Sequence, residues 1–261
     1  MADGAARLRE AFAAAERPLL VPYMMGGFPT LGASRDVARA LGAHADILEI
    51  GIAFSDPLAD GPTVQAAGQV ALDAGVVPDD VIALAGDVRD GPPVVLMTCL
   101  NLVMAGPPER FMRAAADAGV AGLIVSDLPC DEGDDVRAAA RQAGVAMISL
   151  VAPTTTDERL ADVAKVAEGF VYCVSVTGVT GGAVSVDDDL AAFVARVKRA
   201  IPLPVVVGFG VQTPEHAAAI GRFADGVVVG SQLVRAIERD GLDAAAGLAG
   251  AMAAALRGDG N

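Results

Sequence analysis

Two acidic residues, Glu49 and Asp60, occur in a setting that suits proton transfer. They belong to the segment EIGIAFSDPLADGP at residues 49–62, in which Glu49 ends an apolar run and Asp60 lies on a loop bounded by Gly and Pro. An acid in a dry environment and an acid in a wetter one acquire different pKa values, so such a pair can divide acid and base work. Taken alone, the two residues also fit a paired structural acid and a turn residue, because most acids lie at surfaces and in turns.

Other reactive residue types are scarce. The two histidines, His44 and His216, occur in Ala-rich helical contexts, which disfavours His-based nucleophilic triads and His-ligated metal sites, so no metal is predicted. Cys99, Cys130 and Cys173 have no CxxC spacing and are expected to be free thiols in a reducing cytosol. Carboxylates and tyrosine therefore remain as the proton carriers.

The composition excludes several classes of protein. The net charge is −14 and no basic run occurs, whereas nucleic-acid binding needs clustered Lys and Arg. No apolar stretch approaches the length of about 18 residues that a membrane span needs, and the N-terminal residues carry charges throughout, unlike a signal peptide. We expect a soluble, cytoplasmic protein that binds neither nucleic acid nor membrane.

Short apolar runs alternate with Ala-rich segments of helical character, many of which end in Gly. Repeated strand–helix units predict parallel strands, and the number of runs predicts a single (β/α)8 barrel, a TIM barrel of class α/β, over residues 1–261. An extra helix is expected near the N-terminus and another after the second strand. An open doubly wound sheet is the alternative. The predicted strands are residues 19–24, 47–51, 94–98, 122–126, 146–151, 170–176, 204–210 and 226–230.

In such a barrel the chemistry lies on the loops that follow the C-terminal ends of the strands. Glu49 closes the second predicted strand, Asp60 lies in the loop after it, Asp127 follows the fourth strand and Tyr172 lies within the sixth. The topology therefore predicts that these side chains gather at one mouth of the barrel.

Gly-rich segments follow the last three predicted strands, at residues 177–182, 208–210 and 230–231. Glycines allow backbone N–H groups to approach an anion closely, and Ser231 is expected to begin a helix whose N-terminus favours a phosphate. Each segment alone also fits a tight turn. Their common position at the barrel mouth favours a phosphate site.

Several motifs resemble the α subunit of tryptophan synthase over almost the whole chain. The most specific is SDPLADGP at residues 55–62, and the order of the others agrees with the family: PYMMGGFP at 22–29, SVTGVTGG at 175–182, VGFGVQTPE at 207–215 and DGVVVGS at 225–231. The resemblance implies a TIM-barrel lyase of tryptophan biosynthesis that cleaves indole-3-glycerol phosphate to indole and glyceraldehyde 3-phosphate. It also implies an α2β2 complex with a β subunit, which alone carries the cofactor, pyridoxal phosphate.

The resemblance assigns roles to individual residues. Glu49 matches the general acid/base, Asp60 the carboxylate that faces the indole N–H, and Tyr172 a supporting tyrosine. Thr180 matches a residue of the loop that closes the site. The positions that match the phosphate site are Gly181, Gly210, Gly230 and Ser231, and those that match the indole pocket are Tyr23, Met97, Ile124, Leu150 and Phe209.

The chemistry of this reaction explains the residue types. Cleavage of the bond between indole C3 and the glycerol chain requires protonation of C3, which places positive charge on the ring nitrogen. Ionised Asp60 would stabilise that charge, and Glu49 would pass protons between the side-chain hydroxyl and C3. A raised pKa, caused by the apolar strand end, would suit Glu49 to both directions of transfer.

Three positions depart from the family pattern: Ala53 replaces a usual Pro, Cys99 a frequent Tyr and Val176 a frequent Arg. The changes at 53 and 176 are expected to loosen the loops around the site, and we expect the Gly-rich loop 176–188 to be mobile without ligand. A free-standing lyase, a weakly active subunit that mainly regulates a β partner, and another phosphosugar barrel therefore remain as alternatives. The family places the partner contact around Asp56, Pro57 and Asn101.

Overall fold

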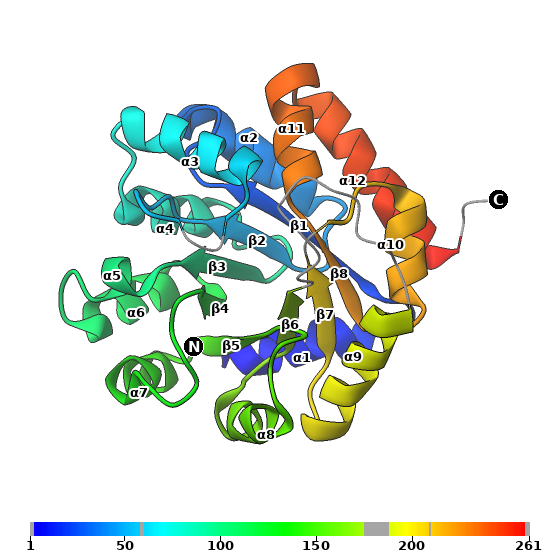
Figure 1. Ribbon diagram of the computed structural model, residues 1–261. Coiled ribbons are helices and arrows are strands. Elements are labelled where there is room, and N and C mark those ends of the chain that lie inside the picture. Colours follow the sequence, from blue (N-terminus) through cyan, green and yellow to red (C-terminus); the bar gives the residue numbers. More distant parts are fainter. Residues whose placement is uncertain (1–2, 58–59, 175–187, 209, 259–261) are drawn as a thin grey trace.

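Eight parallel strands close into a barrel with helices around it (Figure 1). This computed structural model describes residues 3–57, 60–174, 188–208 and 210–258. Each strand pairs with the next along the chain, and β8 pairs with β1 to complete the ring. The strands are β1 (Leu19–Met25), β2 (Leu48–Gly51), β3 (Val94–Thr98), β4 (Val120–Val125), β5 (Ala146–Val151), β6 (Val171–Val174), β7 (Val205–Gly208) and β8 (Gly226–Val229).

The strands are apolar because the barrel interior covers one face and the helices cover the other. All seven residues of β1 and all four of β7 are buried, as expected of strands in a parallel sheet that is covered on both sides. Against this background Glu49 stands out, since it is the only acidic side chain among the buried residues that the structure describes. A buried carboxyl group is costly, so its position calls for an explanation.

Helices connect consecutive strands, and several end as their sequences predict. Gly119 follows α6 with φ 82°, and Gly144 ends α7 with φ 75°, a left-handed conformation that Gly adopts without strain. The helices are α1 (Gly4–Ala14), α2 (Leu31–Gly42), α3 (Pro62–Asp73), α4 (Pro78–Asp87), α5 (Leu100–Val103), α6 (Pro108–Asp117), α7 (Asp134–Ala143), α8 (Asp157–Val166), α9 (Asp188–Ala200), α10 (Pro214–Gly221), α11 (Ser231–Asp240) and α12 (Leu242–Arg257).

Helix α1 closes the N-terminal mouth of the barrel. Its first residue, Gly4, donates its N–H to the carbonyl oxygen of Gly144 at 2.8 Å, just before β5. A Cβ atom at Gly4 would lie 2.0 Å from the carbonyl oxygen of Ala121, so only Gly permits this close approach. Phe12 packs on Phe170, with ring centroids 5.8 Å apart. Because α1 occupies this end, the opposite mouth is the one left for a ligand.

The predicted architecture is confirmed. The barrel, the N-terminal helix and the additional helix after β2, where both α3 and α4 occur, agree with the sequence prediction. Two helices were not predicted, the short α5 and the C-terminal α12. None of the described helices combines the length and apolar character that crossing a membrane requires.

Candidate active site

Glu49 lies inside the barrel, on β2, between Tyr23 of β1 and Val95 of β3. Its side chain is almost completely buried, and neither carboxylate oxygen has a hydrogen-bond partner among the described residues. Burial, and secondarily the charge of Asp60, raises the pKa of Glu49 to about 8. At neutral pH the group therefore holds a proton that it can donate.

Asp60 belongs to the loop between β2 and α3. Its backbone N–H donates to the carbonyl oxygen of Pro57 at 3.2 Å, and its own carbonyl accepts from the Gln65 side chain at 2.9 Å. These two bonds hold the loop while the carboxyl group remains half-buried. Burial raises the pKa of Asp60 to about 6, so at neutral pH this acid is mainly ionised. The two acids thus have opposite protonation states at the same pH.

Two buried tyrosines accompany the acids. A Cβ atom at Gly51 would lie 2.2 Å from the hydroxyl oxygen of Tyr23, and one at Gly208 would lie 2.2 Å from that of Tyr172. The two glycines therefore provide the space that the phenol groups occupy. Burial raises the pKa of both tyrosines well above the ordinary value, and the charges of Glu49 and Asp60 add to the effect. Both phenols are consequently neutral and able to donate a hydrogen bond.

A small cavity opens beside Asp60 at the C-terminal mouth. Its volume of about 20 Å³ is enough for roughly one water molecule, so an indole ring can enter only if side chains of the wall move. Tyr23 and Met97, which were predicted for the indole pocket, line this cavity, whereas Ile52, Phe54, Thr98 and Ser126 were not predicted for it. The full lining is Tyr23, Gly51, Ile52, Phe54, Pro57, Asp60, Met97, Thr98, Cys99 and Ser126.

The other residues predicted for the indole pocket are placed differently. Ile124 on β4 pairs with Met97, and Leu150 on β5 pairs with Tyr172, so both lie on strands beside the site without lining this cavity. Phe209 is outside the described residues.

The departure at residue 99 is visible in the wall. The Cys99 Sγ atom lies 3.7 Å from the Ser126 hydroxyl oxygen, and burial raises the pKa of the thiol. Ala53, in the loop between β2 and α3 that carries Asp60, is also buried. Asp127, which was expected at the mouth, accepts a hydrogen bond from the Leu100 N–H at 2.7 Å and so anchors the start of α5.

The predicted phosphate site is partly described. Gly210 follows β7 with φ 77°, a conformation that favours Gly. Gly230 follows β8 and caps α11, which begins at Ser231 as predicted. The free N–H groups of that helix start are suited to an anion. Thr180, Gly181 and the loop 176–188, including Val176, lie outside the described residues.

The closed barrel, with buried Glu49 and half-buried Asp60, defines a TIM-barrel protein with a candidate acid–base site. The sequence model of the family described as "Tryptophan synthase alpha chain" matches residues 10–256. The chain belongs to this family, whose members are carbon–carbon lyases of tryptophan biosynthesis.

Known relatives agree with this assignment. The tryptophan synthase alpha chain of Carboxydothermus hydrogenoformans is 46% identical over 222 residues, which cover 84% of this chain and 83% of the relative. That of Gluconacetobacter diazotrophicus is 47% identical and covers 92% and 88% of the two chains. A solved structure of Mycobacterium tuberculosis tryptophan synthase superposes with a TM-score of 0.91 at 39% identity, covering 96% of this chain and 98% of that one.

Proposed function

We propose that Glu49 and Asp60 divide the proton transfers by which this chain cleaves indole-3-glycerol phosphate to indole and glyceraldehyde 3-phosphate. The observation that carries the proposal is the burial of Glu49 inside the barrel without a hydrogen-bond partner among the described residues, while Asp60 on the following loop is only half-buried. Burial accordingly raises the pKa of Glu49 to about 8 and that of Asp60 to about 6. Each group is then in the form that its role requires at neutral pH.

The reaction follows from these two forms. Protonated Glu49 donates its proton to indole C3, and the positive charge that develops on the ring nitrogen is stabilised by the Asp60 carboxylate. Glu49, now ionised, accepts the proton of the side-chain hydroxyl as the carbon–carbon bond breaks. Indole and the aldehyde leave, and Glu49 is protonated again. Tyr172 supports the acids as a neutral donor from β6.

The remaining predicted residues bind the two ends of the substrate. Tyr23, Met97, Ile124, Leu150 and Phe209 contact the indole, and Thr180 closes the site over it. The phosphate is held by backbone N–H groups at Gly181, Gly210, Gly230 and Ser231, which need no cationic side chain.

Acid–base groups of the chain suffice for this cleavage, so we assign it no cofactor and place pyridoxal phosphate in the β subunit alone. The chain functions as the α component of tryptophan synthase with that subunit, in an α2β2 complex. Asp56 and Asn101, assigned to the contact, are exposed, and Pro57 is half-buried. A cytoplasmic location fits three cysteines that form no disulfide.

The test is the release of indole from indole-3-glycerol phosphate by the purified chain, with and without a β subunit. Activity that rises on addition of the β subunit is the expected result. Equal activity in both conditions would identify a free-standing lyase. No activity in either condition would refute the catalytic proposal and favour a regulatory subunit.

A further inference from the structure

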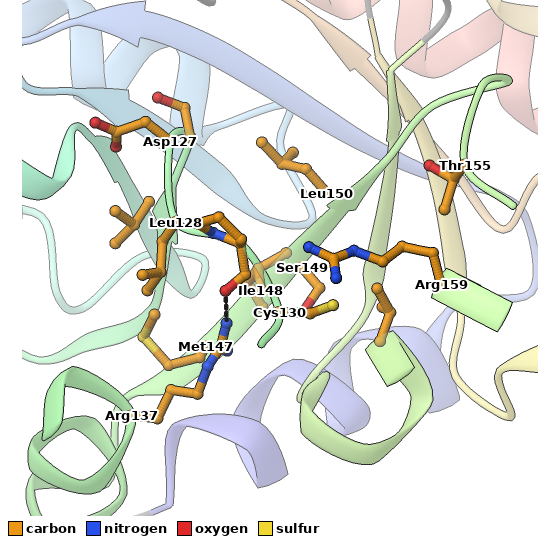
Figure 2. A pocket seen from close by; sticks show the side chains of 14 residues that line it. Asp127, Leu128, Cys130, Arg137, Met147, Ile148, Ser149, Leu150, Thr155 and Arg159 are labelled. Carbon is orange, nitrogen blue, oxygen red and sulfur yellow. Dashed lines mark hydrogen bonds between the residues drawn. The ribbon is translucent and has the colours of Figure 1, made fainter. Parts of the chain in front are cut away.

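A second cavity lies on the outside of the barrel wall, where β4 and β5 face α7 and α8 (Figure 2). Its volume is about 320 Å³, which falls within the range of small-ligand pockets, about 300–1,000 Å³. Loop residues 126–130 form one side and β5 contributes Met147 and Ser149. It shares Ser126 with the small cavity beside Asp60, and Leu150, which was predicted for the indole pocket, also lines it. Neither Glu49 nor Asp60 is among its lining residues.

Arg137 of α7 is the most unusual group in this cavity. It is only 5% exposed. Its guanidinium donates from Nη2 to the carbonyl oxygen of Pro129 at 3.0 Å and from Nε to that of Glu132 at 3.4 Å. Nη1 has no hydrogen-bond partner in the described part of the chain, and no carboxylate there forms an ion pair with Arg137. A buried cation without an anionic partner is costly, so an anion that entered the cavity would stabilise it.

Other donors face the same space (Figure 2). The Ser149 hydroxyl has no hydrogen-bond partner among the described residues, and the Thr155 hydroxyl accepts from the Ala152 N–H at 3.0 Å, which leaves its own proton to donate. Arg159 approaches from α8 and is paired with Asp131 through two bonds of 2.8 and 2.6 Å. Asp131 lies outside the lining, and the carboxylate that does line the cavity, Asp127, already accepts the Leu100 N–H at 2.7 Å.

We propose that this cavity binds a small anion, a carboxylate or a phosphate ester, whose oxygens accept from Arg137 Nη1 and from the Ser149 hydroxyl. The planar guanidinium suits either anion, because carboxylate and phosphate oxygens both match its parallel N–H groups. The site is independent of the roles assigned to Glu49 and Asp60.

Cys130 provides a local reporter, because its thiol lines this cavity and is partly exposed, whereas Cys99 lines the catalytic cavity and Cys173 is buried. The experiment measures alkylation of each cysteine by N-ethylmaleimide, a neutral reagent, with peptide mass spectrometry of the full chain. Succinate and inorganic phosphate are the two probes, and sodium chloride at equal ionic strength is the control. A probe at ten times its Kd is expected to slow alkylation of Cys130 about tenfold, with succinate leaving Cys99 unchanged.

Two variants locate the effect. Arg137→Met removes the charge and is expected to weaken protection at least tenfold, whereas Arg113→Met, an exposed arginine on α6, preserves it. Because Arg137 also holds the loop through Pro129 and Glu132, Ser149→Val is the second test, since it removes the hydroxyl donor and leaves those bonds intact. It is expected to weaken protection as well. Protection by neither probe, or equal protection in all four proteins, would overturn the proposal.

Discussion

At the N-terminal mouth of the barrel an acid just before β2 is fully bonded, whereas another acid, inside β2, has no hydrogen-bond partner among the described residues. Asp46, just before β2, accepts the Leu20 N–H at 2.7 Å and pairs with Arg17 through bonds of 2.8 and 3.0 Å. Glu49, within β2, is more deeply buried and has no hydrogen-bond partner among the described residues. Two carboxylic acids close together in the sequence therefore have different roles: Asp46 stabilises the fold, whereas Glu49 is available for proton transfer.

The bonded arrangement recurs around the N-terminal mouth. Glu168, before β6, accepts the Met147 N–H of β5 at 3.0 Å, and Asp225, before β8, accepts the Val205 N–H of β7 at 2.8 Å. In each case an acid that precedes one strand binds a backbone N–H at the start of the strand before it. These acids fix the strand ends, and their bonds compensate for the loss of hydration.

The hydrogen-bonded acids stabilise the barrel, whereas Glu49, whose oxygens are not bonded by described residues, is suited to chemistry. An acid whose oxygens are satisfied by the fold has little freedom to exchange a proton with a ligand. An acid buried without partners has a raised pKa and reacts readily once a substrate supplies those partners. Changes at the two mouths should accordingly have different consequences.

The largest expected effect is on catalysis in Glu49→Gln. The amide has the size of the protonated acid but cannot donate a proton to C3, so kcat should fall about 10²–10⁴-fold while substrate affinity stays near normal. Steady-state indole release and substrate titration measure the two quantities. Glu10→Gln, an exposed position on α1, is the matched control. Turnover at the normal rate in Glu49→Gln would remove its assigned role.

Asp60→Asn should reduce kcat by about 10²–10³-fold, because a neutral amide stabilises the charged indole ring less well than a carboxylate. It should also lower the pKa of Glu49, since the Asp60 charge is one of the causes that raise it. The pH dependence of the residual activity reports this shift. The control is Asp73→Asn on the exposed side of α3. An unchanged rate would show that the ring nitrogen is stabilised by another group.

The pH–rate profile sharpens the contrast between the two acids. Activity requires ionised Asp60 and protonated Glu49, so kcat/KM should decline below about pH 6 and above about pH 8. Each limb should fall about tenfold per pH unit. A profile that stays flat from pH 5 to 9 would be incompatible with the assigned protonation states.

Stability should also depend on Glu49. Its pKa is raised from 4.5 to about 8 in the folded chain, so the folded state binds the proton more tightly than the unfolded state does. The resulting stability is complete below about pH 4.5 and is lost as the pH rises through about 8. Relative to Glu49→Gln, the wild type should lose on the order of 5 kcal/mol of unfolding free energy over this range. Urea denaturation of both proteins at pH 5 and pH 9 measures this loss. If the difference in unfolding free energy between the wild type and Glu49→Gln is the same at both pH values, the prediction is contradicted.

The smallest expected effect is on stability, from a substitution at the N-terminal mouth of the barrel. Asp46→Ala leaves the Leu20 N–H and Arg17 without their acceptor and should lower the free energy of unfolding by about 1–3 kcal/mol. Because the Asp46 carboxylate is bonded to Arg17 and the Leu20 N–H before β2 begins and contacts neither Glu49 nor Asp60 through those bonds, kcat should remain within about twofold. Urea denaturation and indole release measure the two effects, with exposed Asp36→Ala on α2 as the control. A large loss of kcat with unchanged stability would reverse the proposed division.

Local sequence signals were sufficient for much of the fold. Each strand has a compact apolar run, and the observed strands agree with the predicted ones to within a few residues, as at β5, 146–151. Helix α5 was missed because its first N–H is bonded by Asp127, from the loop after the next strand. Such a contact between distant segments has no local signature.

The site was predictable to the same extent. The apolar run around Glu49 already indicated a dry acid, but the prediction that Glu49 closes the strand was wrong, because Ile50 and Gly51 continue β2 beyond it. The clearance that Gly51 and Gly208 give to the tyrosine hydroxyls depends on neighbouring strands, and so does the buried, unpaired state of Arg137. These features can be predicted only when the register of the barrel strands is known.

The most direct test is a ¹³C NMR titration of the side-chain carboxyl groups of Glu49 and Asp60, assigned with Glu49→Gln and Asp60→Asn. We predict that Glu49 titrates near pH 8 and Asp60 near pH 6, so that between these values one group is protonated and the other ionised. If both groups titrate near pH 4, as exposed acids do, the division of acid and base work between them is contradicted.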